Sequence, residues 1–331
     1  MLSKKAENMR KKILILGATG FIGRNVAEYF AGIQDVDVYG THYKSAPLEH
    51  PKIQMIQADL RNPADVDNVI KGMDVVIQAA AVTSGAKDIV TNPVVHIADN
   101  AVMNSLIFRS AFEHATAHVV FFSCSVMYHS SDTPLRETDF DANREVYPSY
   151  FGGAWNKVYF EKMCEFYARL GRNKYTVLRH SNIYGPYDKY DLNKSHVFGA
   201  TVTKVMTAKE GDKIRVWGTG EEERDLLYAA DLTRCVDIAI SKQEKPFALY
   251  NVGYGRSISV KDLVSKIIEL SGKELVSEHD LSKPSIRTKV CLDCTKAKEE
   301  LGWAPLVSLD DGIRKTLAWY KKNVLANERR L

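Results

Sequence analysis

The segment KILILGATGFIG, residues 12–23, joins an apolar run to a loop that carries three glycines. A nearly continuous apolar run is typical of a strand that is buried on both faces of a parallel sheet. Gly17 permits a tight turn, Gly20 lets the backbone approach a pyrophosphate, and Gly23 lets the following helix pack close to the strand. The N-terminus of that helix offers free N–H groups and a positive dipole end to phosphates. The segment therefore predicts a dinucleotide-binding loop at the end of a first strand.

The same pattern of short apolar runs continues along the chain. The further predicted strands are 36–41, 53–57, 74–80, 118–123, 175–179 and 247–253. Candidate helices lie between them, at 21–31, 63–71, 95–115 and 154–170. This alternation predicts an α/β fold, a Rossmann-like doubly wound parallel sheet with a smaller C-terminal α/β lobe. Right-handed crossovers place the carboxyl ends of the strands along one edge, where ligands bind.

Composition excludes several classes of protein. The chain has 331 residues, of which 45% are hydrophobic and 26% charged, so we expect a folded protein. A net charge of +4 argues against a dedicated nucleic-acid binder. The apolar runs fall short of the roughly 18 residues that a membrane helix needs, and the N-terminus does not resemble a signal peptide. Five cysteines are a sparse, odd set, which favours the cytoplasm, and the CxxC at 291–294 has too few further ligands nearby for a metal site.

The end of the second predicted strand bears on the choice of dinucleotide. An NAD-binding protein usually has Asp or Glu about 20 residues after the glycines, where it holds the ribose 2′-hydroxyl. Here the chain carries Thr41, His42 and Lys44 and no acidic side chain. Lys44 could pair with a 2′-phosphate, so the sequence favours NADP(H), while NAD(H) stays possible. The alternative for His42 and Lys44 is that they are solvated loop residues.

Further cofactor contacts are expected after the third and fourth strands. Asp59 could accept a hydrogen bond from an adenine amine, or it could cap a turn. Small side chains at 79–81 would let the cofactor lie against the sheet edge, or would serve tight packing. The full expected set is Gly17, Gly20, Phe21, Ile22, Gly23, Thr41, His42, Lys44, Asp59, Leu60, Ala79, Ala80, Ala81 and Lys157.

The motifs together resemble those of the extended short-chain dehydrogenase/reductase family, which contains the NAD-dependent epimerases and dehydratases of nucleotide sugars. The matching motifs are GATGFIG, AAAVTSGA, LRHSNIYGP, WGTGEEERDLLYAAD, YNVG and KAKEELGWAPLVSLDDGIRKTLAWY. Within the family, SNIYGPYDKYDLNKSHVFGA, VWGTG and AAAVTSGAKDIVTNP are especially similar to the GDP-L-fucose synthase-like group. The resemblance implies an NAD(P)-binding Rossmann domain over 1–180 and about 230–254. It implies a nucleotide-sugar-binding lobe over 181–229 and 255–331.

The resemblance also implies substrate contacts and an assembly. Asn182, Arg224 and Arg287 match family positions that touch the diphosphate or ribose of the sugar nucleotide. Their plain reading is that they are surface turn residues, and for Arg224 a weak surface ion pair with the next residue. Members of the family usually form dimers through two helices of each subunit, here 101–115 and 154–170.

The resemblance breaks at the catalytic residues. The family uses a Ser or Thr, a Tyr and a Lys, with the Tyr four residues before the Lys. Lys157 matches the lysine, but Gly153 stands four residues before it. Cys124 stands at the Ser/Thr position, with Ser125 beside it. His196 matches a histidine of the fucose synthase-like members.

Three interpretations of this departure stay open. In the first, another group supplies the proton: Tyr150, His196, Cys124 or a water held by Lys157. Tyr150 is about 10 Å of helix from Lys157, too far for the usual geometry unless the chain folds back, and two glycines should loosen the start of the helix. In the second, the enzyme needs little acid catalysis, whose loss costs roughly 10²–10⁴-fold in rate. In the third, the protein binds a nucleotide sugar without turnover.

The sequence therefore predicts a cytoplasmic NAD(P)-dependent epimerase/reductase, with hydride transfer at sugar C4 of a GDP-linked deoxyhexose or heptose. The alternatives are a non-catalytic or regulatory nucleotide-sugar-binding protein, and a 4-dehydrogenase/epimerase of UDP- or dTDP-sugars. The expected catalytic residues are Lys157, Cys124, Ser125, Tyr150 and His196. The expected substrate contacts are Asn182, His196, Arg224 and Arg287. We expect a homodimer, no metal, no nucleic acid and no membrane.

Overall fold

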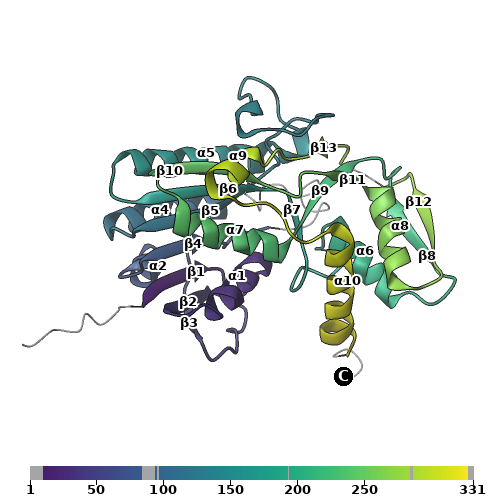
Figure 1. Ribbon diagram of the computed structural model, residues 1–331, viewed down its shortest axis with the longest axis horizontal. Coiled ribbons are helices and arrows are strands. Elements are labelled where there is room, and N and C mark those ends of the chain that lie inside the picture. The colour runs from purple at the N-terminus through teal and green to yellow at the C-terminus, as the bar shows by residue number, and fades with distance from the viewer. Residues whose placement is uncertain (1–9, 84–93, 95–96, 193, 284–285, 327–331) are drawn as a thin grey trace, which may run out of the picture.

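A seven-stranded sheet forms the centre of the molecule in the computed structural model (Figure 1). The structure describes residues 10–83, 94, 97–192, 194–283 and 286–326. The strand order is β10-β6-β5-β4-β1-β2-β3, and all neighbouring pairs are parallel. The strands are β1 (Lys11–Leu16), β2 (Val36–His42), β3 (Ile53–Gln57), β4 (Val75–Gln78), β5 (His118–Cys124), β6 (Lys174–His180) and β10 (Phe247–Val252). The predicted doubly wound sheet is confirmed, and each of its strands lies within two residues of a predicted run.

Helices cover both faces of this sheet, because alternate side chains of its strands point to opposite sides. One face packs against α1 (Phe21–Ala31), α7 (Ala229–Lys242) and α9 (Thr295–Leu301). The other packs against α2 (Pro63–Ile70), α4 (Ala98–Glu113) and α5 (Phe151–Arg169). In β1, Ile13 and Ile15 belong to the first core, and Leu14 and Leu16 to the second. Both faces are thus buried, which explains why the predicted strands are continuous apolar runs.

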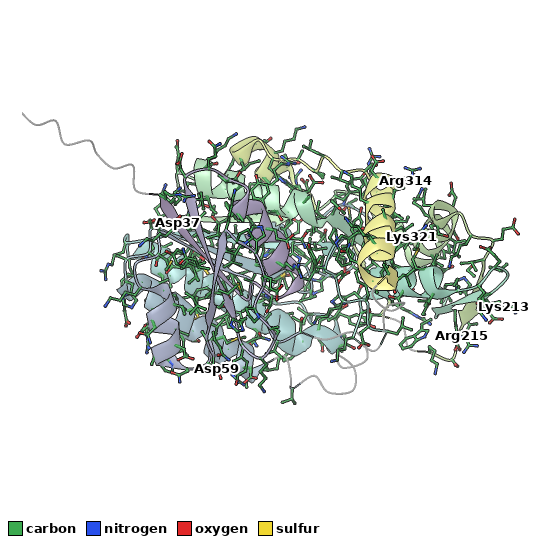
Figure 2. All side chains as sticks on the ribbon, turned by 90° about the horizontal axis from the view of Figure 1, so that it is seen from below. Asp37, Asp59, Lys213, Arg215, Arg314 and Lys321 are labelled. Carbon is green, nitrogen blue, oxygen red and sulfur yellow. The ribbon has the colours of Figure 1, made fainter. Side chains whose placement is uncertain are left out.

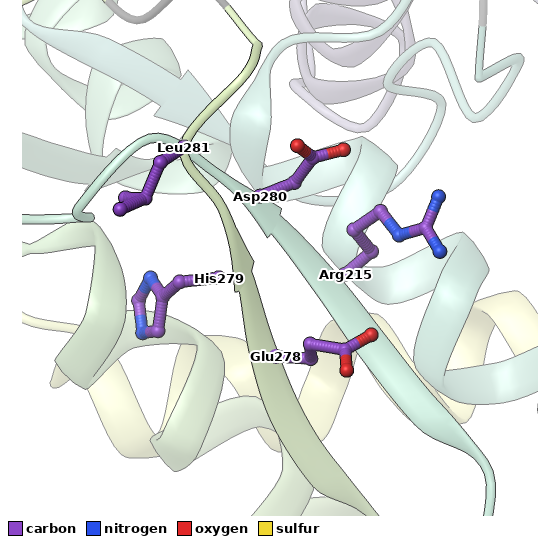
Figure 3. Close-up of a pocket in the computed structure, with 5 residues that line it drawn as sticks. All are labelled: Arg215, Glu278, His279, Asp280 and Leu281. Atoms are coloured by element: carbon purple, nitrogen blue, oxygen red, sulfur yellow. The ribbon is translucent and has the colours of Figure 1, made fainter.

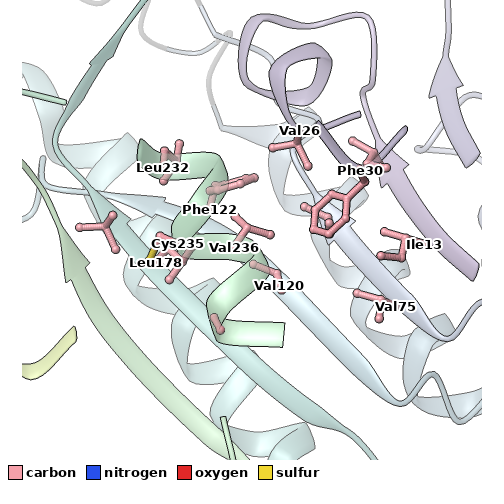
Figure 4. Packing of buried hydrophobic residues seen from close by; sticks show 14 of the residues in the cluster. Ile13, Val26, Phe30, Val75, Val120, Phe122, Leu178, Leu232, Cys235 and Val236 are labelled. Carbon is pink, nitrogen blue, oxygen red and sulfur yellow. The ribbon is translucent and has the colours of Figure 1, made fainter. Parts of the chain in front are cut away.

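Figure 4 shows the first of these cores from close by. Val26 and Phe30 of α1 lie over one half of the sheet, and Leu232 and Val236 of α7 lie over the other. Each fully buried aliphatic or aromatic side chain contributes roughly 1.5–3 kcal/mol. Trp303, directly after α9, is also buried in this core. Residues 295–303, which we assigned to the second lobe by sequence, therefore pack on the large sheet.

Helix α5 begins earlier than the sequence predicts. It runs from Phe151, after a short 3₁₀ helix over Pro148–Tyr150, and contains both Gly152 and Gly153. A Cβ on Gly152 would lie 2.5 Å from Ile97 Cδ1, so the glycine permits close contact with the segment before α4. The helix includes both glycines despite their low helix propensity. The close packing of Gly152 against Ile97 stabilises this start.

The second part of the molecule is built from smaller elements, at the right of Figure 1. Strands β11, β9 and β13 form a sheet with β7 pairing to β9, and β12 pairs with β8. Its strands are β7 (Asn182–Tyr184), β8 (Lys213–Trp217), β9 (Glu223–Tyr228), β11 (Ser257–Ser259), β12 (Val276–Asp280) and β13 (Lys289–Val290). Its helices are α6 (Val197–Thr207), α8 (Val260–Ser271) and α10 (Leu309–Tyr320). A 3₁₀ helix at Glu137–Asp139 and a π-helical end at Lys321–Leu325 complete the described elements. In Figure 2, Lys213 and Arg215 lie at the opposite end of the molecule from Asp37 and Asp59.

Tyr187 connects the two parts. Its φ angle of 68° is in the left-handed region, which is unfavourable for a side chain other than glycine. Its hydroxyl donates to Glu28 Oε2 of α1 at 3.0 Å, and the Arg24 guanidinium lies 3.9 Å from its ring centroid. Trp319 of α10 packs edge-on against the same ring. These contacts hold the strained residue and attach helix α1, which follows the glycine loop, to the second part.

Candidate functional site

The glycine loop has the shape that a dinucleotide pyrophosphate requires. Gly17 has φ 76°, and a Cβ there would lie 2.7 Å from Ala80 Cα. A Cβ on Gly23 would lie 2.1 Å from the Gly17 carbonyl oxygen, so helix and turn touch. A Cβ on Gly20 would meet only the Gly17 carbonyl, at 3.3 Å, which leaves its other side open. The loop therefore fits a pyrophosphate at the N-terminus of α1.

Two of the expected cofactor contacts have buried side chains in the structure. Thr41 is 1% exposed, and its Oγ1 accepts a hydrogen bond from the Gly17 N–H at 2.9 Å. Thr41 is the second-last residue of β2, and its hydrogen bond ties this strand to the Gly17 turn. Leu60 is buried in the core beside α2 and is not available to a ligand. Ala80 packs against Gly17, so tight packing explains that position, whereas Ala81 is exposed.

The end of β2 carries the residues that we expect near the adenosine ribose. His42 Nδ1 lies 2.9 Å from the Ser45 carbonyl oxygen, so the imidazole holds the turn. Lys44 is exposed, and its ammonium lies 5.3 Å from the Tyr43 ring centroid. Both positions lie at the carboxyl edge of the sheet, next to the glycine loop.

Asp59 has a partner that sequence reasoning missed. Arg61 donates to both carboxylate oxygens of Asp59, at 2.9 Å each, and to Asp99 Oδ2 at 3.1 Å. Hydrogen bonding from Arg61 lowers the pKa of Asp59 to about 2. A carboxylate has about four acceptor positions, and a third bond comes from the Arg61 N–H, so little capacity remains for an adenine amine. The arginine two residues after the aspartate was the signal in the sequence.

Lys157 reaches the end of β5 from helix α5. Its Nζ donates to the Phe122 carbonyl oxygen at 2.7 Å and lies 4.8 Å from the Phe121 ring centroid. Burial lowers the pKa of Lys157, while Cys124 opposes this shift. Burial likewise raises the pKa of Cys124, the last residue of β5, and Lys157 opposes it. Cys124 is therefore a neutral thiol close to the lysine.

A narrow pocket of about 40 Å³ brings together residues from separate parts of the sequence, and Lys157 is not among the residues that line it. It is lined by Ser125 after β5, Tyr150 before α5, Asn182 of β7 and Arg224 of β9. The other lining residues are Val126, Tyr128, Glu223, Thr288 and Val290. Burial raises the pKa of Tyr150, and the charge of Arg224 opposes this rise. Four residues predicted from the sequence therefore line one pocket. The phenol of Tyr150, one of the four, is protonated at neutral pH.

Arg224 does not form the surface ion pair with Asp225 that was the alternative prediction from the sequence. Its guanidinium donates to the Thr288 carbonyl at 2.8 Å and to the Ile286 carbonyl at 2.9 Å. Asp225 is buried and accepts backbone N–H bonds instead, at 2.7 Å from Tyr254 and 3.1 Å from residue 292. Arg287, between the two carbonyls that Arg224 binds, is exposed.

The histidines lie at the margin of this region. His196 is exposed and forms the N-cap of α6, and it does not line the pocket. His180, which sequence reasoning did not single out, ends β6 in register with Cys124. Burial lowers the pKa of His180 to about 4, and the charges of Lys157 and His196 lower it further. These side chains therefore share one electrostatic environment.

Gly153 faces open space. A Cβ built there meets no atom within 4 Å, in contrast to Gly152 one residue earlier. Residues four apart on a helix lie on the same face, so this space adjoins Lys157. Packing does not require a glycine at this position.

A buried polar network supports the site from behind, and sequence reasoning missed it. Glu161, one turn after Lys157, accepts from Arg179 Nη2 at 2.7 Å and from Ser123 Oγ at 2.5 Å. Arg179 also donates to the Tyr128 hydroxyl at 2.8 Å, and this hydroxyl donates to Asn251 Oδ1 at 2.8 Å. The network joins β5, α5, β6 and β10 at their carboxyl ends, and so fixes the helix that carries Lys157.

The remaining features lie apart from this site. A hollow of about 430 Å³ lies beside β8 and β12, lined by Arg215, Glu278, His279, Asp280 and Leu281. Figure 3 shows His279 and Leu281 on one side of the strands and the charged residues on the other. No residue that we predict from the sequence is among those five. The five cysteines, all in described positions, are unpaired.

Known proteins resemble this chain over most of its length. Residues 13–253 match the NAD dependent epimerase/dehydratase family. GDP-L-fucose synthase of Azorhizobium caulinodans is 31% identical over 326 residues, which cover 94% of this chain and 96% of that protein. GDP-L-colitose synthase of Yersinia pseudotuberculosis is 28% identical and covers 93% of this chain and 97% of its own. A structure of UDP-glucose 4-epimerase with UDP-glucose, from Thermotoga maritima, has a TM-score of 0.81 at 25% identity, covering 95% and 99% of the two chains.

Proposed function

The chain belongs to the NAD dependent epimerase/dehydratase family, and from this premise we propose that it is a nucleotide-sugar epimerase/reductase. We propose hydride transfer at C4 of a GDP-linked deoxyhexose or heptose, since two of its relatives are named for GDP-L-fucose and GDP-L-colitose synthesis. One observation carries the proposal. The glycine loop and the Lys157 contact lie at the carboxyl ends of β1 and β5, and one pocket joins Ser125, directly after β5, to Asn182 and Arg224 of the smaller sheet.

Each residue of the site has a task in this proposal. A bound reduced nicotinamide supplies the hydride for the sugar carbonyl carbon. The loop around Gly20 holds the pyrophosphate of the dinucleotide, and Lys157 places its charge beside the reacting oxygen. Arg224 binds the diphosphate of the sugar nucleotide, because a guanidinium offers paired donors to phosphate oxygens. Asn182 hydrogen-bonds the substrate at the opposite wall. Cys124, Ser125, Tyr150 and His196 remain the candidates for proton transfer.

NADP(H) is the cofactor that we propose, with NAD(H) as the weaker substrate. The support is the exposed Lys44 at the end of β2, where the chain carries no acid to repel a 2′-phosphate. Lys44→Ala should raise the KM for NADPH roughly tenfold more than the KM for NADH, since it removes one charge-assisted contact. Lys52→Ala is the matched control, since Lys52 is an exposed lysine at the amino end of β3, away from the end of β2. Equal effects on the two cofactors in Lys44→Ala would contradict the assignment.

A homodimer through α4 and α5 is part of the proposal. These helices expose large apolar side chains, among them Val102, Tyr159, Phe166 and Leu170, each between 45% and 57% exposed. An apolar patch of this kind on a folded protein is typical of an interface. Phe166→Glu should convert the dimer to a monomer in sedimentation velocity.

We also propose a cytoplasmic location, supported by cysteines that remain unpaired. Across the described ranges, the structure contains no helix with both the length and the apolar character to span a membrane.

Two other functions compete with this one. A glycine at 153 and a cysteine at 124 favour a non-catalytic or regulatory nucleotide-sugar-binding protein of the same fold. A 4-dehydrogenase/epimerase of UDP- or dTDP-sugars is the other candidate, since the similar Thermotoga maritima structure contains UDP-glucose.

One experiment separates them: incubation with NADPH and GDP-4-keto-6-deoxymannose in deuterated water, with product analysis by NMR. The proposed enzyme gives an alcohol at C4, and epimerisation adds solvent deuterium at C3 or C5. Binding of the GDP-sugar without either change would contradict an enzyme for this substrate. Turnover only of UDP- or dTDP-sugars would favour the second alternative. Arg224→Met should abolish binding in every case.

A further inference from the structure

We infer that the phenol of Tyr150 donates the proton to the sugar oxygen as hydride reaches C4. The inference rests on the proposed function and names its acid. Gly153, four residues before Lys157, has no proton to give, so the group must come from elsewhere in the same pocket.

The chain brings Tyr150 to the pocket without folding back. The 3₁₀ helix over Pro148–Tyr150 leads directly into α5, and Tyr150 is the N-cap with φ −101° and ψ −3°. Its side chain lines the pocket together with Ser125, Asn182 and Arg224. The phenol therefore does not have to touch Lys157 across two helical turns. It has to touch a sugar that lies between them.

Open space over Gly153 allows this arrangement. A Cβ at Gly153 meets nothing within 4 Å, so the volume between Tyr150 and Lys157 on this face of α5 is not filled by a neighbouring side chain at that position. Gly153 is three residues after Tyr150, about 4.5 Å along the helix axis. In this proposal the bound sugar presents its C4 oxygen to a phenol one turn further from Lys157.

The charges around Tyr150 suit an acid. Burial keeps the phenol protonated at neutral pH, which a donor requires. Arg224 faces the same pocket, and its positive charge stabilises the phenolate that remains after donation.

His196, Lys157 and His180 are less suited to donate. His196 is exposed at the start of α6 and is not among the residues that line the pocket. Lys157 donates to the Phe122 carbonyl. His180 donates to the Ser181 carbonyl through Nδ1 and packs beside the Phe122 ring, on the side of α1 and α7.

Reduction of the sugar carbonyl forms one C–H bond and one O–H bond. The hydride pair forms the new bond to carbon C4, and the π electrons of the carbonyl remain on its oxygen. The O–H bond of Tyr150 breaks and the proton forms the C4 hydroxyl. Water then returns a proton to the phenolate, which restores Tyr150.

The test compares Tyr150→Phe with Tyr147→Phe, whose ring lies beside Tyr150 with centroids 5.7 Å apart but does not line the pocket. Tyr150→Phe should lower kcat about 10²–10⁴-fold while the Kd for the GDP-sugar and the Tm stay unchanged. Tyr147→Phe should stay near the wild type. Adding Gly153→Tyr to Tyr150→Phe should restore part of kcat, because the added phenol enters the open space. A Tyr150→Phe enzyme as active as Tyr147→Phe would overturn the inference.

A second readout does not depend on turnover. The phenolate absorbance of Tyr150, measured as wild type minus Tyr150→Phe during a pH titration, should appear at higher pH when GDP fills the pocket. The reason is that a diphosphate on Arg224 cancels the charge that favours the phenolate. An unchanged titration with GDP bound would show that Tyr150 does not face the ligand, and would overturn the inference. A wild type without turnover but with this shift would reject the proposed reaction and support the placement of the phenol.

Discussion

The buried pair Glu161–Arg179 allows a direct test of how helix α5, which carries Lys157, is held. We consider Arg179→Met, which keeps much of the side-chain volume and removes the charge. Arg179 and Glu161 are 6% and 4% exposed, and two hydrogen bonds of 2.7 and 3.0 Å join them. The variant leaves the Glu161 carboxylate buried with Ser123 Oγ as its remaining partner in this network.

The magnitude follows from the burial of the carboxylate. Breaking a buried pair by removing one partner costs about 3–5 kcal/mol, because the other charge is left uncompensated. Arg179 also donates to the Tyr128 hydroxyl and to the Glu137 carbonyl, which puts the loss toward the upper end of that range. A fall in Tm of roughly 10 °C should accompany it. Replacing both partners, Glu161→Met with Arg179→Met, removes the uncompensated charge and should recover roughly 2 kcal/mol.

Urea unfolding followed by circular dichroism gives these free energies. The control is Lys213→Met, which removes an ion pair to Glu278 at 2.8 Å between side chains that are 64% and 43% exposed. Solvent screens such a pair, so the control should unfold like the wild type. The reasoning fails if Arg179→Met is no less stable than Lys213→Met, or if the double variant is less stable than Arg179→Met.

Three further predictions concern backbone strain, helix packing and pH. Tyr187→Gly should be more stable than Tyr187→Ala by about 1 kcal/mol in urea unfolding, because glycine adopts the left-handed conformation without strain; equal stabilities would contradict the strain. Gly153→Ala should stabilise α5 by roughly 0.5–1 kcal/mol, whereas Gly152→Ala should gain less because Ile97 has to move, and the same measurement compares them. Burial raises the pKa of Asp188 to about 7, so the folded protein holds a proton that the unfolded chain loses near pH 4. The contribution of this group to stability is therefore present at low pH and lost as the pH rises toward 7. Asp188→Asn should lose less stability than the wild type between pH 4 and 7, and parallel pH curves would contradict this.

The central sheet could be predicted because each of its strands leaves a signal in a short stretch of sequence. Strands with both faces covered are continuous apolar runs, and the turn at Gly17 leaves a recognisable spacing of glycines. The start of α5 could not be predicted, because it depends on contact between Gly152 and Ile97, which are 55 positions apart in sequence. Propensity alone places the helix start after both glycines.

The residues of the candidate site likewise include some that local sequence patterns predict and some that they do not. The elements that carry the glycine loop and Lys157 could be predicted, because the loop joins β1 to α1 and Lys157 lies within α5. Arg179 was missed because its partner Glu161 is set by tertiary contact between β6 and α5. Arg61 is different, because its partner Asp59 lies only two residues away in the sequence. The resemblance to nucleotide-sugar enzymes located the pocket residues, but it could not show which of them share one hollow.

The measurement that tests the central claim most directly is a single-turnover reaction, followed by NADPH absorbance, with GDP-4-keto-6-deoxymannose and enzyme in excess. The account predicts oxidation of one equivalent of cofactor per substrate in the wild type, and its loss in Lys157→Ala with GDP-sugar binding intact. No oxidation of NADPH or NADH by a wild type that binds the GDP-sugar would contradict the account.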